Sequence, residues 1–121
     1  MSSYAKLDHW SLKAQKEGYP ARSVYKLKEM DEKFSLFRFP RSGNTAPSAA
    51  SFRVLDIGAA PGSWSLYALR KMAGLGFLAS VDLAPLSRVY DKGLFEGENF
   101  FFVQGDVYDL PVRETLAPRP L

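Results

Sequence analysis

The chain has 121 residues, of which 46% are hydrophobic and 24% charged, and it contains no cysteine. This composition predicts one soluble domain and excludes a disulfide scaffold, a thiolate metal site and a cysteine nucleophile. No apolar run approaches the ~20 residues that cross a bilayer, and the polar start lacks the pattern of a signal peptide. We therefore expect a cytoplasmic protein with no membrane partner. The net charge of +3 is uneven, because residues 1–44 carry nine Lys and Arg against five acids, whereas residues 45–121 carry seven against eight.

The first 37 residues predict a basic helical arm. Residues 4–17 favour a helix with an irregular apolar stripe, which Gly18-Tyr19-Pro20 ends. A second helix is predicted over 21–34, because apolar residues recur there at three- and four-residue steps: Val24, Leu27, Met30 and Phe34. Turn-forming residues then predict a loop or linker over 38–51, which separates the arm (1–37) from a second unit (52–121).

From residue 52 onward, strand and helix patterns alternate. Strands are predicted over 52–57, 77–81 and 100–103, a helix over 63–72, and a turn with one helical stretch over 85–97. This order predicts an α/β fold, the opening of a Rossmann-like doubly wound parallel sheet. Residues 111–121 contain three prolines and are typical of a frayed end.

The most informative segment is Asp56-Ile-Gly-Ala-Ala-Pro-Gly-Ser-Trp64, in which a strand enters a Gly and Ala loop and a helix begins at once. Small side chains let a ligand approach the backbone, and the first N–H groups of the helix face that ligand. The dinucleotide fingerprint would place glycine at position 60 and has no reason for Pro61, where a pyrophosphate needs N–H donors. The segment therefore predicts a cofactor without a diphosphate.

Two acids follow the next strands. Asp82 ends the second strand, 20 positions after Gly62, where a carboxylate can accept hydrogen bonds from ribose hydroxyls, and Asp106 follows the third strand. Because parallel strands end at one edge of a sheet, we expect Asp56, Gly58, Gly62, Asp82 and Asp106 to converge on an adenosine-binding crevice. The competing interpretation is that these carboxylates cap the turns after the strands. The ordered set of glycine loop and two acids favours the binding site.

Two segments of the chain resemble the FtsJ/RrmJ family of S-adenosylmethionine-dependent RNA 2′-O-ribose methyltransferases. Residues 56–64 are similar to the first methyltransferase motif of that family, and residues 14–27 (AQKEGYPARSVYKL) resemble the basic segment that precedes its sheet. With 81–85 and 104–106, the resemblance covers nearly the whole chain apart from 38–51 and the last ten or so residues. It implies S-adenosyl-L-methionine as cofactor and RNA as substrate, ribosomal RNA first and transfer RNA as the other choice.

The resemblance also implies residue roles. The backbone of Gly62 and Trp64 would hold the methionine part of the cofactor, Asp82 the ribose hydroxyls, and Asp106 would lie beside the adenine amino group. The indole of Trp64 could equally pack on the sheet. Lys26 matches the first lysine of a catalytic Lys-Asp-Lys-Glu set, although from the helix alone it is an ordinary surface charge.

The basic residues of the arm form a second group of candidates. Four of them would contact RNA phosphates: Lys13, Lys16, Arg22 and Lys28. Trp10, Tyr19 and Tyr25 lie among them and could stack on bases or pack inward. The only histidine, His9, has no second ligand-type neighbour at metal spacing, so no metal site is predicted.

The Asp, second Lys and Glu of the family's catalytic set would follow the third strand, and the sequence ends at Leu121 before any of them. We therefore expect the N-terminal, cofactor-binding portion of the domain, truncated after about the third strand and inactive in methyl transfer alone. In the order 3-2-1-4-5 the first strand would lack its fourth-strand neighbour, and this apolar edge predicts association or poor solubility. Two alternatives stay open: a non-catalytic RNA- or adenosine-binding module and, with less support, a fragment of an NAD-dependent oxidoreductase.

Overall fold

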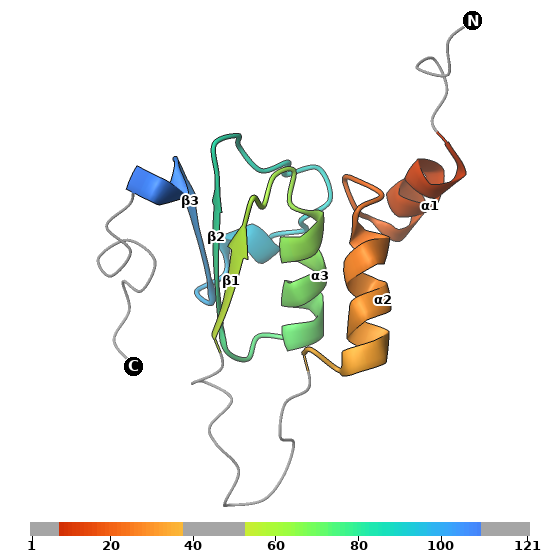
Figure 1. The fold of residues 1–121 in the computed structure, drawn as a ribbon, viewed down its shortest axis with the longest axis horizontal. Helices are drawn as coiled ribbons and strands as arrows, with labels where there is room; N and C mark the ends of the chain where they lie inside the picture. The colour runs from red at the N-terminus through yellow and green to blue at the C-terminus, as the bar shows by residue number, and fades with distance from the viewer. Residues whose placement is uncertain (1–7, 38–52, 110–121) are drawn as a thin grey trace, which may run out of the picture.

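The structure, a computed structural model, describes residues 8–37 and 53–109 (Figure 1). Its elements in chain order are α1 (His9–Glu17), α2 (Val24–Phe34), β1 (Arg53–Ile57), α3 (Ser63–Met72), β2 (Phe77–Asp82), the 3₁₀ turn η3 (Leu94–Glu96), β3 (Phe100–Gln104) and the 3₁₀ turn η4 (Val107–Asp109). The predicted α/β order is confirmed. The predicted linker 38–51 and the tail 111–121 lie outside the described residues. Within the described ranges, no helix is long and apolar enough to cross a membrane.

The three strands form one parallel sheet in the order β1-β2-β3, which confirms the 3-2-1 part of the predicted order. Helix α3 covers one face of this sheet, and α2 and α1 lie on the same side (Figure 1). The core forms between α3 and the sheet, where the largest fully buried apolar side chains are Leu66, Leu69, Met72 and Leu78. The continuous burial of β2 is what a central parallel strand requires.

Strand β1 lies at the edge of the described sheet. Its side chains alternate, so Val54 packs into the core beneath α3 while Leu55 and Ile57 are 48% and 59% exposed on the other face. The apolar edge that the sequence predicts is therefore present. Association through it stays a prediction.

Helix α2 packs directly against α3. Val24 and Leu27, both on the predicted apolar face, join Tyr67 of α3 in a buried cluster. The Tyr67 hydroxyl donates to Asp31 Oδ2 at 2.7 Å, and Asp31 Oδ1 accepts from the backbone N–H of Phe37 at 3.2 Å. Burial, together with this hydrogen bond, raises the pKa of Tyr67. The N-terminal helices are thus attached to the α3 layer by apolar contacts and by a buried hydrogen bond.

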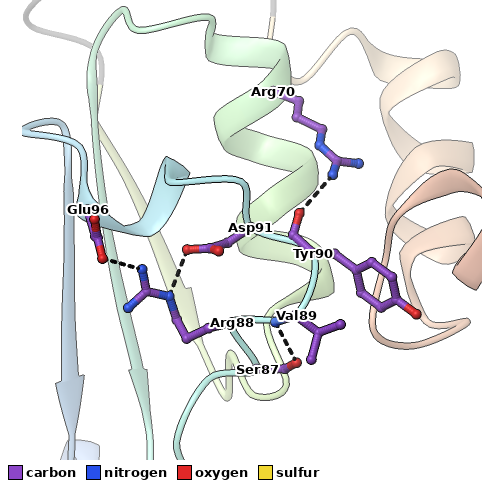
Figure 2. Close-up of polar contacts among 7 residues, drawn as sticks. All are labelled: Arg70, Ser87, Arg88, Val89, Tyr90, Asp91 and Glu96. Carbon is purple, nitrogen blue, oxygen red and sulfur yellow. Dashed lines mark hydrogen bonds and ion pairs between the residues drawn. The ribbon is translucent and has the colours of Figure 1, made fainter.

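Arg70 of α3 connects three segments. Its guanidinium donates to the backbone carbonyls of Glu17 (3.2 Å), Gly18 (3.0 Å) and Tyr90 (3.4 Å), and it lies 4.5 Å from the ring centre of Tyr19. Figure 2 shows the contact with Tyr90, which belongs to the segment between β2 and η3. The end of α1 and this segment are therefore held by one side chain.

An ion-pair cluster connects the same segment to η3 (Figure 2). Arg88 Nε donates to Asp91 at 2.7 Å, and its Nη2 donates to Glu96 at 2.9 Å. Asp91 is buried whereas Glu96 is exposed, so the pair with Asp91 fixes the path of the chain before Phe95 enters the core.

Candidate cofactor-binding site

Two adjoining pockets lie at the carboxyl edge of the sheet, and both are lined by Ile57 and Gly58. The first has a volume of about 230 Å³ and is formed by the loop between β1 and α3 together with Ser23. The second, of about 170 Å³, lies between the ends of the three strands; its remaining lining residues are Val81, Asp82, Leu83, Gly105, Asp106 and Val107. The sequence predicts one crevice at this edge, and the two pockets that share Ile57 and Gly58 lie there.

The two glycines of the loop have different surroundings. Gly58 (φ +77°) faces open space, since a Cβ added there would meet no atom within 4 Å. Its bare backbone can therefore approach a ligand closely. Gly62 (φ +115°) is buried, and an added Cβ would lie 3.1 Å from Phe95 Cζ. Gly62 lines neither pocket, so its missing side chain accommodates Phe95, and ligand binding by its backbone stays a prediction.

Asp82 lies in the second pocket and also orders the loops around it. Its Oδ1 accepts from the backbone N–H of Ala84 at 3.0 Å and its Oδ2 from that of Ala60 at 2.8 Å. These hydrogen bonds, from Ala84 first and then Ala60, hold the pKa of Asp82 below its ordinary value. Each carboxylate oxygen has a second lone pair, so the capping and ribose-binding interpretations are compatible.

Asp106, which follows β3, likewise accepts a backbone hydrogen bond and lines the second pocket. Its Oδ1 accepts from the backbone N–H of Tyr108 at 2.9 Å, which starts the η4 turn, and the residue lines the second pocket while remaining exposed. The fold thus brings Asp82 and Asp106 to one cavity, which Gly58 also lines.

Asp56 lines the first pocket and connects it to the core. Its Oδ2 accepts from the Ser65 hydroxyl at 2.7 Å, and Ser65 lies 2.7 Å from the hydroxyl of Ser80. Burial raises the pKa of Asp56; the hydrogen bond from Ser65 opposes this effect, and the charge of Asp82 adds to it. Sequence reasoning missed both serines. The available signal was Ser80, the one polar residue of the predicted strand 77–81.

Ser63 and Trp64, at the start of α3, form hydrogen bonds with the turn before α2. The Trp64 indole N–H donates to the carbonyl of Ser23 at 2.9 Å. The Ser63 hydroxyl accepts from the backbone N–H of Ala21 at 2.8 Å and lies 3.2 Å from that residue's carbonyl. Since Ser23, Ser63 and Trp64 all line the first pocket, the turn before α2 forms one of its walls. The indole of Trp64 serves this attachment.

Lys26 is an exposed residue one helical turn after Ser23, on the same face of α2. Because Ser23 lines the first pocket, Lys26 lies on the face of α2 whose N-terminal end is at that pocket. Lys28, two residues later, points about 200° away around the helix. The fold therefore does not bring Lys28 to the face that carries Lys26.

The remaining basic candidates are on or near α1. Arg22 forms an ion pair with Asp8, with both side chains half exposed. The Lys13 ammonium lies 5.3 Å from the ring centre of Trp10 and 5.0 Å from that of Tyr25. Lys16 is exposed. Across the described part of the chain, no three His, Cys, Asp or Glu side chains are grouped as a metal site requires.

An open parallel sheet with a glycine loop and strand-terminal acids at its carboxyl edge defines a Rossmann-like α/β fold. Comparison with protein families narrows this class, because the model of the FtsJ-like methyltransferase family matches residues 19–120. The chain belongs to the FtsJ-like methyltransferase family, as the resemblance predicts. Membership implies a methyl donor and does not favour the oxidoreductase alternative.

Curated relatives agree with the family. The chain is 49% identical over 109 residues to the ribosomal RNA large subunit methyltransferase E of Treponema denticola, covering 89% of this chain and 46% of the relative. It is 48% identical over 101 residues to the protein of that name from Borreliella afzelii (84% and 43%) and 46% identical over 95 residues to that from Nitratidesulfovibrio vulgaris (78% and 41%). The chain spans about half the length of the curated relatives it matches.

Proposed function

We propose that this chain supplies the cofactor-binding portion of an S-adenosylmethionine-dependent RNA 2′-O-ribose methyltransferase that acts on ribosomal RNA. One observation carries the proposal: two pockets adjoin at Gly58, and the second also contains Asp82 and Asp106. This division suits a ligand with an amino-acid part and an adenosine part. The names of the relatives support ribosomal RNA, and such a substrate agrees with a cytoplasmic location.

The residues of the two pockets fit S-adenosylmethionine. The first pocket offers the Asp56 carboxylate and the start of α3, which has no side-chain cap, for an ammonium and a carboxylate respectively. In the second pocket Asp82 would accept from ribose hydroxyls and Asp106 would lie near the adenine amino group. When bound, this cofactor supplies an electrophilic methyl group. The protein's part is to position the acceptor and to exclude water.

Lys26 would hold the acceptor. An ammonium on the helix that begins at the first pocket can donate a hydrogen bond to the target 2′-hydroxyl and orient its oxygen toward that pocket. Phosphate contacts would come from Lys13, Lys16 and Arg22, whereas Lys28, on another side of α2, would contact a separate part of the RNA. Arg22 would exchange its exposed partner Asp8 for a phosphate.

Calorimetry with S-adenosylhomocysteine and with NAD tests the cofactor assignment. We expect the chain to bind S-adenosylhomocysteine, the Asp82→Asn variant to lose this binding, and the exposed Glu98→Gln variant to keep it. The Asn side chain removes the charge and offers one carbonyl where the carboxylate serves both Ala84 and Ala60. Binding of NAD without S-adenosylhomocysteine would overturn the proposal.

The family match does not favour the second candidate from the sequence, a module that binds RNA and adenosine without turnover. The two candidates differ in an assay of labelled methyl transfer to ribosomal RNA. We expect no transfer by this chain alone, and transfer on addition of the C-terminal half of a relative. Transfer by the chain alone would refute the expectation that the other three positions are needed.

A further inference from the structure

An aromatic cluster lies on the outside of the molecule where α1 meets α2. The ring centres of Trp10 and Tyr25 are 5.5 Å apart with tilted planes, and His9 packs edge-on against Trp10 at 5.0 Å. Tyr25 is held in place by its hydroxyl, which donates to Glu17 at 2.7 Å. The Trp10 ring is therefore supported at a defined orientation.

Packing in the core does not account for the position of Trp10. Its side chain is 43% exposed and belongs to neither buried apolar cluster, whereas Tyr25 packs partly against the cluster of Val24, Leu27 and Tyr67. An exposed indole contributes little to folding compared with a buried one. Its ring contacts within the described residues are with a histidine, a tyrosine and a lysine.

Charge around the cluster favours a polyanion. The Lys13 ammonium rests near both rings, and Lys16 is exposed one turn along the same helix edge. At an exposed site the attraction between a cation and a ring is weaker than stacking by a nucleobase. A base can therefore take the ring face while Lys13 turns to a phosphate.

The cluster also lies close to the position proposed for the target hydroxyl. Tyr25 directly precedes Lys26 in α2, so the two side chains are about 100° apart around the helix. A ribose held at Lys26 places the flanking nucleotides of the same strand beside the Trp10 and Tyr25 rings.

We propose that Trp10 stacks on an unpaired RNA base next to the target nucleotide, while Lys13 binds an adjacent phosphate. This inference rests on the proposed function in that RNA is the substrate. Stacking selects single-stranded over paired RNA, because a duplex buries its base faces and offers only phosphates. It tolerates any base, since all have a π face.

The test measures fluorescence anisotropy of a labelled 12-nucleotide single-stranded RNA of mixed sequence, and of its duplex, at one fixed salt concentration. Trp10→Ala should weaken single-strand binding by at least about 5-fold, because stacking contributes roughly 5- to 150-fold per base. Trp10→Phe should weaken it less. Leu12→Ala is the matched control, since Leu12 is an exposed apolar residue of the same helix (51%), and it should change binding by less than about 2-fold.

Two further measurements separate the possible failures. Duplex binding should be unchanged in Trp10→Ala and weakened in Lys13→Ala, and both variants should keep the affinity of the wild type for S-adenosylhomocysteine. Single-strand binding by Trp10→Ala equal to that of Leu12→Ala overturns the stacking role and leaves the cofactor assignment intact. A change of oligomeric state in Trp10→Ala, seen by size-exclusion chromatography, also overturns it and identifies a protein contact. Absence of RNA binding by the wild type overturns both the stacking role and the proposed RNA substrate.

Discussion

The contrast between Gly62 and Gly58 gives a sharp prediction about stability. Alanine at position 62 would adopt φ +115°, a conformation that costs about 1–3 kcal/mol for a residue with a side chain. Its Cβ would also lie 3.1 Å from the Phe95 ring, which is packed in the core, and such overpacking costs about 1–3 kcal/mol. Gly62→Ala should therefore destabilise the domain by about 2–6 kcal/mol, a large part of the 5–15 kcal/mol typical of a domain.

Alanine at position 58 has only the conformational cost, about 1–2 kcal/mol, because its Cβ meets no atom. Because Gly58 lines both pockets, a side chain at this position should weaken the binding of S-adenosylhomocysteine. Gly74→Ala is the matched control, since Gly74 has φ +84° and open space around it but lies at the end of α3, away from both pockets. It should lose as much stability as Gly58→Ala and keep full binding.

Urea denaturation followed by tryptophan fluorescence measures the stabilities, and calorimetry measures the binding. Phe95→Leu should partly rescue Gly62→Ala, because the smaller side chain leaves room for the added methyl group. Equal stability of the Gly62 and Gly74 variants would refute the role given to the Phe95 contact. Equal loss of binding in the Gly58 and Gly74 variants would refute the placement of Gly58 in the site.

Three further predictions concern groups around the site. Because the pKa of Asp56 is raised in the folded state, its full contribution to stability is present below pH 3.8 and is lost as the pH rises through the shifted pKa. Asp56→Asn should therefore reduce the fall of the urea midpoint with pH above 3.8. A pH dependence of the midpoint equal to that of the wild type would contradict this. Tyr67→Phe removes the donor to buried Asp31 and should cost about 1–3 kcal/mol in the same assay, whereas no loss would show that the hydroxyl is dispensable. Trp64→Phe removes the hydrogen bond to the turn before α2, so trypsin should cleave after Arg22 faster than in the wild type; unchanged cleavage would mean that the indole N–H does not hold the turn.

Much of the fold follows from spacing alone. The three- and four-residue steps predicted the buried face of α2 correctly at Val24 and Leu27 but not at Phe34, which ends the helix and is 65% exposed. The short apolar runs predicted all three strands. The convergence of Asp82 and Asp106 on one pocket follows from parallel topology, because parallel strands end at the same edge. These inferences needed only local periodicity and one topological rule.

Contacts between distant segments could not be predicted in this way. Asp31 is a charged residue, a type usually found on the surface. It is buried here, and its partner Tyr67, which donates to it, lies on another helix. The need for glycine at position 62 was visible, but whether a ligand or a side chain fills the space depends on Phe95, 33 positions later (95 − 62). The same holds for Trp64, whose partner is the carbonyl of Ser23.

The position of Arg70 has a consequence for how the molecule opens. Its guanidinium joins the carbonyls of Glu17, Gly18 and Tyr90, so the end of α1 cannot leave α3 without also releasing the segment before η3. In native-state hydrogen exchange these separate stretches should behave as one unit with a shared opening free energy. Lysine would not replace this arrangement, because an ammonium lacks the planar set of donors that reaches several carbonyls at once. A single side chain thereby couples local fluctuations at the end of α1 to those of the segment before η3.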